Sequence, residues 1–176
     1  ERHLLKSSYA LFKHLKENDL IGKVGFKDLG AGGVACASVE LAETSGFGSE
    51  VWLNKVHVGM DGLHPSVYLC SETQERFMWV CPPDITPRIL DHYNKVFDLP
   101  GVSKGAKASV IGKIRGDGQY IVHNDGEEIV NASAKEVTRG FFYDREFENP
   151  NLSFSEPDLS LSKDLQKALL KILAHE

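Results

Sequence analysis

Apolar residues recur at helical spacing at the start of the chain. One largely apolar face of a helical wheel carries Leu4, Ser8, Leu11, Phe12 and Leu15, while the lysines of this stretch lie largely elsewhere on it. Such a face is typical of an amphipathic helix that packs on a core. The pattern therefore predicts a helix over residues 3–17.

The next apolar segments are short, and glycines separate them. Residues 24–26 are apolar and lead into residues 28–33 (Asp-Leu-Gly-Ala-Gly-Gly), and residues 34–44 are rich in alanine and other helix formers. We therefore expect a strand, a glycine loop and a helix in this order. Apolar runs predict further strands at residues 51–58 and 77–81.

Two later segments carry the start signals of helices. Thr86 followed by Pro87 suits an N-cap and a first helical turn, and a helical stripe then continues until residues 99–101 (Leu-Pro-Gly), which should end it. Ser133 and Glu136 have the spacing of a capping box, which predicts a short helix after Ser133.

Alternating positions predict strands in the same part of the chain. Residues 107–114 alternate between apolar and polar side chains, and residues 119–123 and 128–131 flank residues 124–126 (Asn-Asp-Gly), a turn suited to a hairpin. Helices and strands are thus mixed, with at least one hairpin. The pattern predicts an α+β fold, with helices packed on a largely antiparallel or mixed sheet.

The composition changes toward the C-terminal end. Residues 144–160 are polar, contain two prolines and have few apolar anchors, so we expect a linker there. Leucines and an isoleucine at helical spacing predict a last amphipathic helix in residues 161–176. The main domain should therefore occupy residues 1–143, and the last helix should pack on another part of the protein.

Charge and length exclude several classes of protein. The 176 residues suit one compact domain plus an appendage. The net charge is -5, and the sequence contains no basic run that could neutralise a row of phosphates. No stretch approaches the ~20 apolar residues of a membrane span. We expect neither a nucleic-acid nor a membrane partner, and since the chain begins with Glu1, we expect an excised piece of a longer protein.

The cysteines and histidines give weak signals. Cys36, Cys70 and Cys81 are odd in number and widely spaced, so neither a disulfide framework nor a zinc site is indicated, and a reducing cytoplasm fits best. His57 and His64 have no metal-ligand spacing. Ordinary surface or core histidines explain them better than a metal or acid-base site.

Residues 28–33 are the first candidate for chemistry. Gly30, Gly32 and Gly33 let backbone come close to a ligand, and the following helix start can aim N–H groups at an anion. Asp28 can give a carboxylate to Mg²⁺, which commonly takes only one or two protein carboxylates. A tight turn whose aspartate caps the helix explains the same residues, and spacing alone favours that interpretation, because this is neither a Walker P-loop nor a Rossmann fingerprint.

Residues 71–76 (Ser-Glu-Thr-Gln-Glu-Arg) are the second candidate. Six polar residues stand between the apolar residues 67–70 and the predicted strand at residues 77–81. Such a set of donors and acceptors beside a core strand can bind the hydroxyl, amide and phosphate groups of a ribotide. A solvated turn explains the segment equally well, and neither candidate alone names a reaction.

Taken together, the two candidates resemble one family. In order and spacing, residues 28–33, 38–42 (Ser-Val-Glu-Leu-Ala), 46–48 and 71–76 resemble the small-type phosphoribosylformylglycinamidine synthase subunit II. The resemblance covers roughly residues 1–140. It implies the α/β sandwich of aminoimidazole ribonucleotide (AIR) synthase-related C-terminal domains, with a mixed sheet, packed helices and partly ferredoxin-like topology.

The resemblance also implies roles for particular residues. Asp28 matches the family's magnesium ligand in this domain, and Glu72, Thr73 and Gln74 match its substrate-binding triplet. Thr73 stands where the usual motif has serine and keeps a hydroxyl, and Lys27 replaces a frequent glutamine. The family's catalytic histidine and ATP-contacting lysine belong to a preceding domain. We therefore expect no catalytic residue here and no activity of the chain alone.

The family's reaction defines the cofactors and partners that the resemblance implies. ATP phosphorylates the amide oxygen of formylglycinamide ribonucleotide with the help of Mg²⁺, and ammonia then displaces the phosphate to leave the amidine. ATP should be bound mainly by domains absent from this chain. The expected partners are the missing N- and C-terminal domains, a glutamine amidotransferase subunit and a small bridging subunit, all in the cytoplasm.

Two other hypotheses stay open on the sequence. The chain can be a domain of another member of the same superfamily, such as AIR synthetase, a selenophosphate synthetase-like protein or a hydrogenase-maturation protein. The polar segment at residues 71–76 argues against these enzymes. A non-catalytic ligand-binding module is the alternative from a different class.

Overall fold

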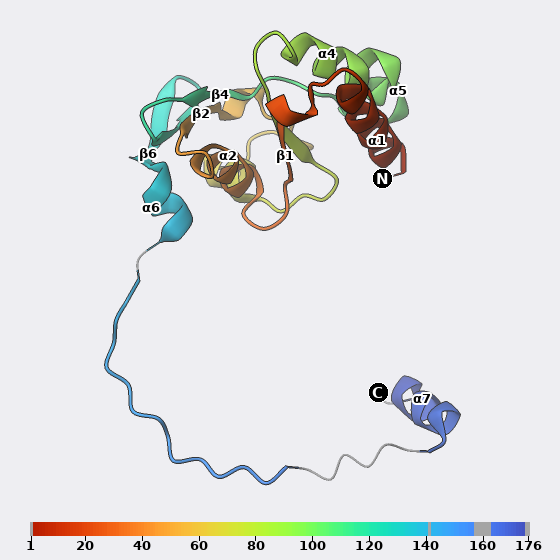
Figure 1. Cartoon of the computed structure of the whole chain (residues 1–176), viewed down its shortest axis with the longest axis vertical. Coiled ribbons are helices and arrows are strands. Elements are labelled where there is room, and N and C mark those ends of the chain that lie inside the picture. The colour runs from red at the N-terminus through yellow and green to blue at the C-terminus, as the bar shows by residue number, and fades with distance from the viewer. Residues whose placement is uncertain (1, 141, 157–162, 175–176) are drawn as a thin grey trace. The chain divides into compact units, whose positions relative to one another are not determined.

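The structure is a computed structural model that describes residues 2–140, 142–156 and 163–174. The chain divides into two units, residues 1–142 and 143–176. In the first unit helices and strands alternate along the chain (Figure 1). Its helices are α1 (Arg2–Glu17), η1 (Ile21–Lys23), α2 (Gly33–Glu43), η2 (Leu53–Lys55), α3 (Pro65–Cys70), α4 (Thr86–Asp91), η3 (His92–Val96), α5 (Leu99–Val102) and α6 (Ala134–Arg139). Its strands are β1 (Gly25–Asp28), β2 (Gly48–Trp52), β3 (Phe77–Val80), β4 (Gly112–Arg115), β5 (Gln119–Asn124) and β6 (Glu127–Ser133).

The strands of the described residues form a small sheet and a larger one. In the small sheet β1 pairs with β3 in antiparallel fashion, with Gly25 opposite Val80 and Asp28 opposite Phe77. The larger sheet has the order β4-β2-β5-β6, in which β2 runs parallel to β5 and the other pairs are antiparallel. This mixed sheet with packed helices confirms the predicted α+β class.

The first hydrophobic core lies between α2 and the sheets. Val34, Ala37 and Val39 of α2 are buried against Val51 of β2 and Val122 of β5. The hydroxyl groups of Ser38 and Tyr120 lie 3.0 Å apart in this core and form a hydrogen bond. A buried hydroxyl costs free energy unless it is bonded, so this pair allows a tyrosine and a serine inside an apolar layer.

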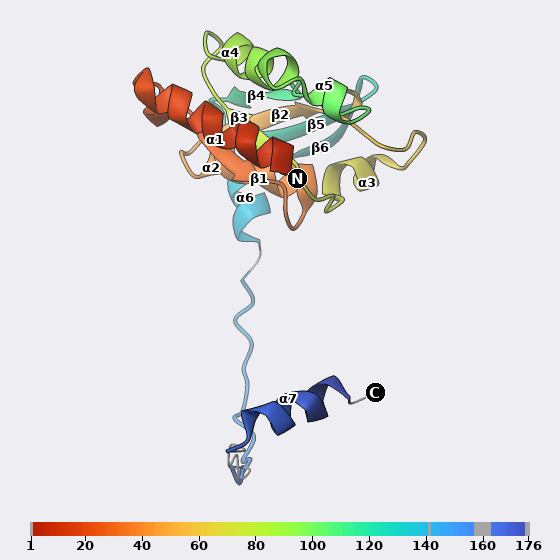
Figure 2. The same cartoon turned by 90° about the vertical axis from the view of Figure 1, so that its right-hand side faces the viewer.

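The second core lies under α1. Leu11 and Leu15 of α1 are fully buried and share a cluster with Ile89 of α4 and Tyr93 of η3. Phe12 contacts the rings of the small sheet, with its centroid 4.9 Å from that of Phe26 and 5.2 Å from that of Trp79. Figure 2 shows α1 running across this sheet. The face predicted over residues 3–17 is therefore the face that packs.

Several local predictions are confirmed. Helix α2 lies one residue from its predicted bounds, and β3 occupies the predicted apolar run at residues 77–81. Strands β5 and β6 form the expected hairpin. Asp125 and Gly126 both have positive φ, 49° and 89°, as the favoured two-residue hairpin turn requires.

The strand predicted at residues 51–58 is misplaced. Strand β2 begins at Gly48 and ends at Trp52, and the 3-10 helix η2 follows it. A Cβ atom at Gly48 would lie 2.0 Å from the carbonyl oxygen of Gln119. Gly48 therefore serves a close approach between neighbouring strands, which is a known use of glycine in a sheet.

The helix predicted after Thr86 has a different start and end. Thr86 is the first helical residue rather than the N-cap, and its hydroxyl donates to the carbonyl of Pro82. The helix continues through the π-helix η3, and the Leu-Pro-Gly segment expected to end it forms the short helix α5 instead. The break falls at Asp98, whose φ is 43°. A left-handed aspartate therefore ends the helix where proline and glycine were expected to do so.

The strand predicted at residues 107–114 is shorter than expected. Only Gly112–Arg115 forms a strand, because the backbone of Ala108 is bonded elsewhere. The N–H group of Ala108 donates to the side chain of Asn94 at 2.7 Å, and its carbonyl accepts from the same side chain at 2.8 Å. Ser133 precedes α6 as predicted, but its side chain makes no capping hydrogen bond.

The second unit contains one described helix. Residues 143–156 are in neither helix nor strand, and α7 spans Leu165–Leu173, with the side chain of Asp164 accepting from the N–H group of Lys167 at 3.0 Å. The predicted helix start at residue 161 lies outside the described residues. Within those residues, no helix is both long and apolar enough to cross a membrane. The proposed division into domain, linker and helix stays a prediction.

Candidate functional site

The pairing of β1 with β3 places the two candidate segments side by side. Asp28 at the end of β1 is opposite Phe77 at the start of β3. The N–H group of Leu29 donates to the carbonyl of Arg76 at 3.0 Å, one step beyond the strands. Because the strands are antiparallel, the glycine loop leaves the small sheet where residues 71–76 enter it.

The glycine loop and the polar segment are in direct contact. The N–H group of Gly32 donates to the carboxylate of Glu72, with 3.3 Å between nitrogen and Oε1. Gly33 has a φ of 56°, and a Cβ atom there would lie 2.3 Å from the carbonyl oxygen of Ser71. Only glycine fits this position, since both the backbone angle and the close approach exclude a side chain.

Two amides at the N-terminal end of α2 already have partners. Glu72 occupies the N–H group of Gly32, and the N–H group of Gly33 donates to the carbonyl of Gly30 at 3.1 Å. A carboxylate at a helix N-terminus is stabilised by the helix dipole. Glu72 therefore holds the position that a ligand anion would take, and an anion can use the amide of Gly32 only by displacing Glu72.

Asp28 and Gln74 line one small pocket. The pocket has a volume of about 190 Å³ and is lined by Leu4, Leu5, Asp28, Leu29, Gln74, Glu75, Arg76 and Phe77. The structure thus brings the predicted magnesium ligand and one predicted substrate-binding residue to the same cavity. Glu72 and Thr73 do not line it, and both are exposed beside it.

Arg76 organises the polar segment, a role that sequence reasoning did not assign to it. Its guanidinium donates to the carbonyl of Ser71, and its Nε donates to the carbonyl of Thr73 at 3.0 Å. Burial lowers the pKa of Arg76 from its ordinary value. The side chain therefore fixes the turn that presents Glu72, Thr73 and Gln74.

Lys27 is engaged away from the pocket. Its Nζ lies 2.8 Å from Oε2 of Glu40 on α2, and the hydrogen bond to Glu40 raises the pKa of Lys27. Successive residues of a strand point to opposite faces, so Lys27 and Asp28 project in opposite directions. The lysine that replaces the family's frequent glutamine is thus committed to Glu40.

The carboxylate of Asp28 suits a magnesium ion better than a transition metal. Among the described residues, no group of three or more histidine, cysteine, aspartate or glutamate side chains can hold a metal ion. Magnesium needs only one or two protein carboxylates, because water and phosphate oxygens complete its shell. An exposed Asp28 at the pocket meets that requirement.

Of the two histidines considered in the sequence analysis, His64 caps α3, where its Nδ1 accepts from the N–H group of Ser66.

Comparison with known proteins identifies a family. Residues 10–124 match the family model described as AIR synthase related protein, C-terminal domain. The phosphoribosylformylglycinamidine synthase subunit PurL of Methanothrix thermoacetophila is 41% identical over 172 residues, which cover 97% of this chain and 22% of that relative. This chain therefore spans about a fifth of the length of the curated relative.

Solved structures agree in fold. PurL of Thermotoga maritima complexed with AMPPCP has a TM-score of 0.68 and 22% identity, over 96% of this chain and 27% of that one. The same protein complexed with FGAR has a TM-score of 0.65 and 24% identity, over 88% of this chain and 24% of that one. The family match covers most of the first unit, including both strands of the small sheet and the glycine loop between them. The chain belongs to the AIR synthase related protein C-terminal domain family.

Proposed function

We propose that this chain forms part of the substrate site of a phosphoribosylformylglycinamidine synthase. The contact between Gly32 and Glu72 is the observation that carries the proposal, because it joins two segments forty residues apart in the sequence. The shared pocket of Asp28 and Gln74 supports it. The relatives named as subunits of this enzyme support it further.

In this proposal each polar residue has a task. Gln74 and Thr73 offer an amide and a hydroxyl that can hydrogen bond to formylglycinamide ribonucleotide. Glu72 orients the glycine loop, and Asp28 is the ligand that would hold Mg²⁺. Bound Mg²⁺ would supply charge stabilisation for the phosphate oxygens of ATP.

The chemistry explains why such a site is needed. An amide oxygen is a poor leaving group until it is phosphorylated, so the substrate amide has to be held in one orientation while the γ-phosphate of ATP is transferred and ammonia attacks. The chain's part is to bind and orient the ribotide. Proton transfer and most contacts to ATP would belong to other domains of the longer protein.

The size of the pocket supports the expectation that the chain alone is inactive. A volume of about 190 Å³ is below the roughly 300–1,000 Å³ of typical small-molecule sites. We therefore propose that neighbouring domains complete the site, and that the longer protein works in the cytoplasm with a glutamine amidotransferase subunit and a small bridging subunit.

The test is an NMR titration of the labelled 176-residue chain with formylglycinamide ribonucleotide. We expect weak, saturable shifts in residues 28–34 and 71–76. Gln74→Ala should abolish these shifts, whereas Gln166→Ala, the same change in the exposed helix α7, should leave them unchanged.

Manganese provides a second readout for the metal ligand. Mn²⁺ prefers the same oxygen ligands as Mg²⁺ and broadens nearby resonances because it is paramagnetic. Broadening should centre on residues 28–34 and disappear in Asp28→Asn. Ribotide shifts spread evenly over the surface, Mn²⁺ broadening that survives Asp28→Asn, or synthase turnover by the 176-residue chain would each contradict the assignment.

A further inference from the structure

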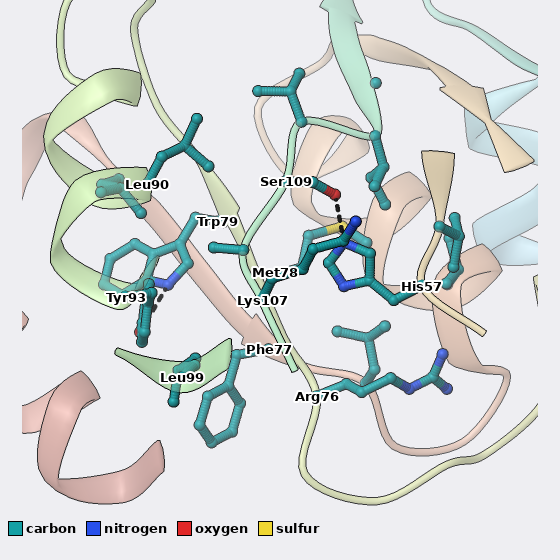
Figure 3. A pocket seen from close by; sticks show the side chains of 18 of the residues that line it. His57, Arg76, Phe77, Met78, Trp79, Leu90, Tyr93, Leu99, Lys107 and Ser109 are labelled. Atoms are coloured by element: carbon teal, nitrogen blue, oxygen red, sulfur yellow. Dashed lines mark hydrogen bonds between the residues drawn. The ribbon is translucent and has the colours of Figure 1, made fainter. Parts of the chain in front are cut away.

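A second, larger cavity adjoins the pocket of Asp28 and Gln74 and shares lining residues with it, among them Leu29, Arg76 and Phe77. Its volume is about 540 Å³, within the range of roughly 300–1,000 Å³ that small-molecule sites occupy. Strand β3, helices α4 and η3, and residues 102–103 and 105–114 surround it (Figure 3). Neither Asp28 nor the triplet at residues 72–74 lines it, so the residues proposed to hold Mg²⁺ and the ribotide do not account for this cavity.

The wall at residues 105–109 explains why the space is open. Gly105, Ala106, Ala108 and Ser109 have small or no side chains and cannot fill the gap between the two hydrophobic cores. The wall is also held in place, because Asn94 bonds both polar backbone groups of Ala108. The cavity is therefore preformed, which lowers the entropy that a ligand would lose on binding.

The interior of the cavity is apolar. Met78, Ile89, Leu90 and Val110 line it, together with the aromatic rings of Trp79 and Tyr93 (Figure 3). The Trp79 indole N–H already donates to the Tyr93 hydroxyl at 3.1 Å, so these two polar groups are satisfied by each other. A ligand that fits there needs an apolar body of aromatic or branched aliphatic character.

Polar groups gather at one side of the cavity. His57 and Ser109 form a hydrogen bond of 2.7 Å there, and Lys107 precedes Ser109 by two residues on the same wall (Figure 3). Burial and the neighbouring Lys107 lower the pKa of His57 below its ordinary value. The lowered pKa favours the neutral imidazole, so the positive charge on this side comes from Lys107. The guanidinium of Arg76 also lines the cavity, but it donates to the carbonyls of Ser71 and Thr73.

Lys107 is an exposed lysine on the wall of the cavity. No ion pair between described residues involves Lys107, whereas Lys113, another lysine of the lining, pairs with Glu50. Glu75 is the acidic member of the lining, although the whole chain carries a net charge of -5. The cavity thus combines an apolar interior with a positive charge in a protein of negative charge.

We propose that this cavity binds a small apolar molecule that carries one anionic group, a carboxylate or sulfonate on an aromatic or branched aliphatic body. The anion lies against the ammonium of Lys107 and the hydroxyl of Ser109, and the apolar body fills the space between Leu90 and Trp79. Charge-assisted hydrogen bonds of this type are the strong ones, so the anionic group contributes a large share of the affinity.

Two fluorescent probes that differ only in charge test the proposal. 1-Anilinonaphthalene-8-sulfonate carries a sulfonate on an apolar body, and N-phenyl-1-naphthylamine is the same body without it. The 176-residue chain should bind the sulfonate saturably at one site and at least ~10-fold more tightly than the neutral probe. Lys107→Gln should weaken the sulfonate ~5- to 10-fold and leave the neutral probe unchanged.

Two further measurements keep the test decisive. Lys104→Gln is the matched control, because Lys104 is an exposed lysine of the same segment that does not line the cavity, and its affinity should equal that of the wild type. NMR mapping of the wild-type chain with the sulfonate should place the shifts in residues 77–80, 86–93 and 105–111.

Three outcomes would overturn the proposal. Equal affinity for the two probes would make the cavity an apolar gap without anion selectivity. Equal losses in Lys107→Gln and Lys104→Gln would reduce the effect to general charge. Shifts confined to α7, whose leucines are exposed, would place the probe on a surface helix instead.

Discussion

Replacing Gly33 by alanine should weaken the contact between the glycine loop and residues 71–76. Gly33 combines a left-handed backbone with a close approach to another segment. Gly32 also has a positive φ, 73°, but the atom nearest to its added Cβ is the Sγ of Cys36, which can rotate away. Gly30 has an ordinary φ. The expected cost of adding a Cβ atom therefore falls from Gly33 to Gly32 to Gly30.

The magnitude follows from the geometry. An L-residue in the left-handed region costs roughly 1–2 kcal/mol, and the reduced entropy of the unfolded chain returns about 0.4–1 kcal/mol. At Gly33 the Cβ atom would also lie 2.3 Å from the backbone oxygen of Ser71, which cannot rotate away. Forcing such an overlap costs typically about 1–3 kcal/mol. The free energy of unfolding should therefore fall by about 2–4 kcal/mol in Gly33→Ala.

The other two variants calibrate this value. Gly32→Ala should lose about 0.5–1.5 kcal/mol, because the backbone strain and the offsetting entropy of the unfolded chain stay but the overlap is relieved. Gly30→Ala should lie within about 0.5 kcal/mol of the wild type, since its Cβ atom would be 3.2 Å from the flexible carboxylate of Asp28. All three values can be measured by urea unfolding followed by circular dichroism.

A structural readout accompanies the stability series. The amide resonance of Gly32 should shift strongly in Gly33→Ala, because displacement of Ser71 also moves Glu72 away from the N–H group of Gly32. Gly30→Ala should leave this resonance near its wild-type position. Equal stability losses in all three variants, or a wild-type value for Gly33→Ala, would refute the close approach.

Three further predictions concern titration and buried bonds. His57 should titrate with a midpoint below 6.5 when its resonances are followed by NMR. Because its pKa in the folded state lies below that in the unfolded state, the free energy of unfolding should rise as the pH rises between these two pKa values. A midpoint above 6.5 would contradict the burial of His57. Arg115 lowers the pKa of Asp117 to about 2. The carboxylate of Asp117 therefore stabilises the fold at pH values above its unfolded pKa, and this stabilisation is lost as the pH falls toward the folded pKa. In Arg115→Leu, the titration midpoint of Asp117 measured by NMR should return toward 3.8. Tyr120→Phe should lower the free energy of unfolding in urea by about 1 kcal/mol, because the Ser38 hydroxyl keeps its hydrogen bond to a helix carbonyl. A loss above about 3 kcal/mol would contradict the view that the Tyr120 hydroxyl makes only this one bond to Ser38.

Local periodicity predicted the parts of the fold that depend on neighbouring residues. The face of Leu4, Leu11 and Leu15 predicts α1, because residues three and four apart share a helix face whatever else the chain does. The hairpin turn at Asp125 and Gly126 is a local matter for the same reason. The alternation at residues 107–114 failed, because the side chain of Asn94, fourteen residues away from Ala108, takes the backbone groups that a strand needs.

The candidate site also combines features that the sequence predicts with features that only the folded chain shows. Asp28, the glycines and the triplet at residues 72–74 were found as residue types in a suitable spacing, and a family resemblance gave them roles. Their adjacency needed the pairing of β1 with β3, which brings together residues about fifty positions apart. Arg76 could not be singled out, since its task depends on two carbonyls whose positions exist only in the folded turn.

By itself, the sequence determined the mixed class of the fold, most of its elements and the residues with chemistry to offer, because periodicity, turn residues and residue type act over short distances. Only the tertiary structure decided that Glu72 occupies the helix amide of Gly32, and that small residues at 105–109 leave a cavity beside Lys107. Contacts and empty spaces of this kind arise when distant segments pack against one another, and no local pattern encodes them.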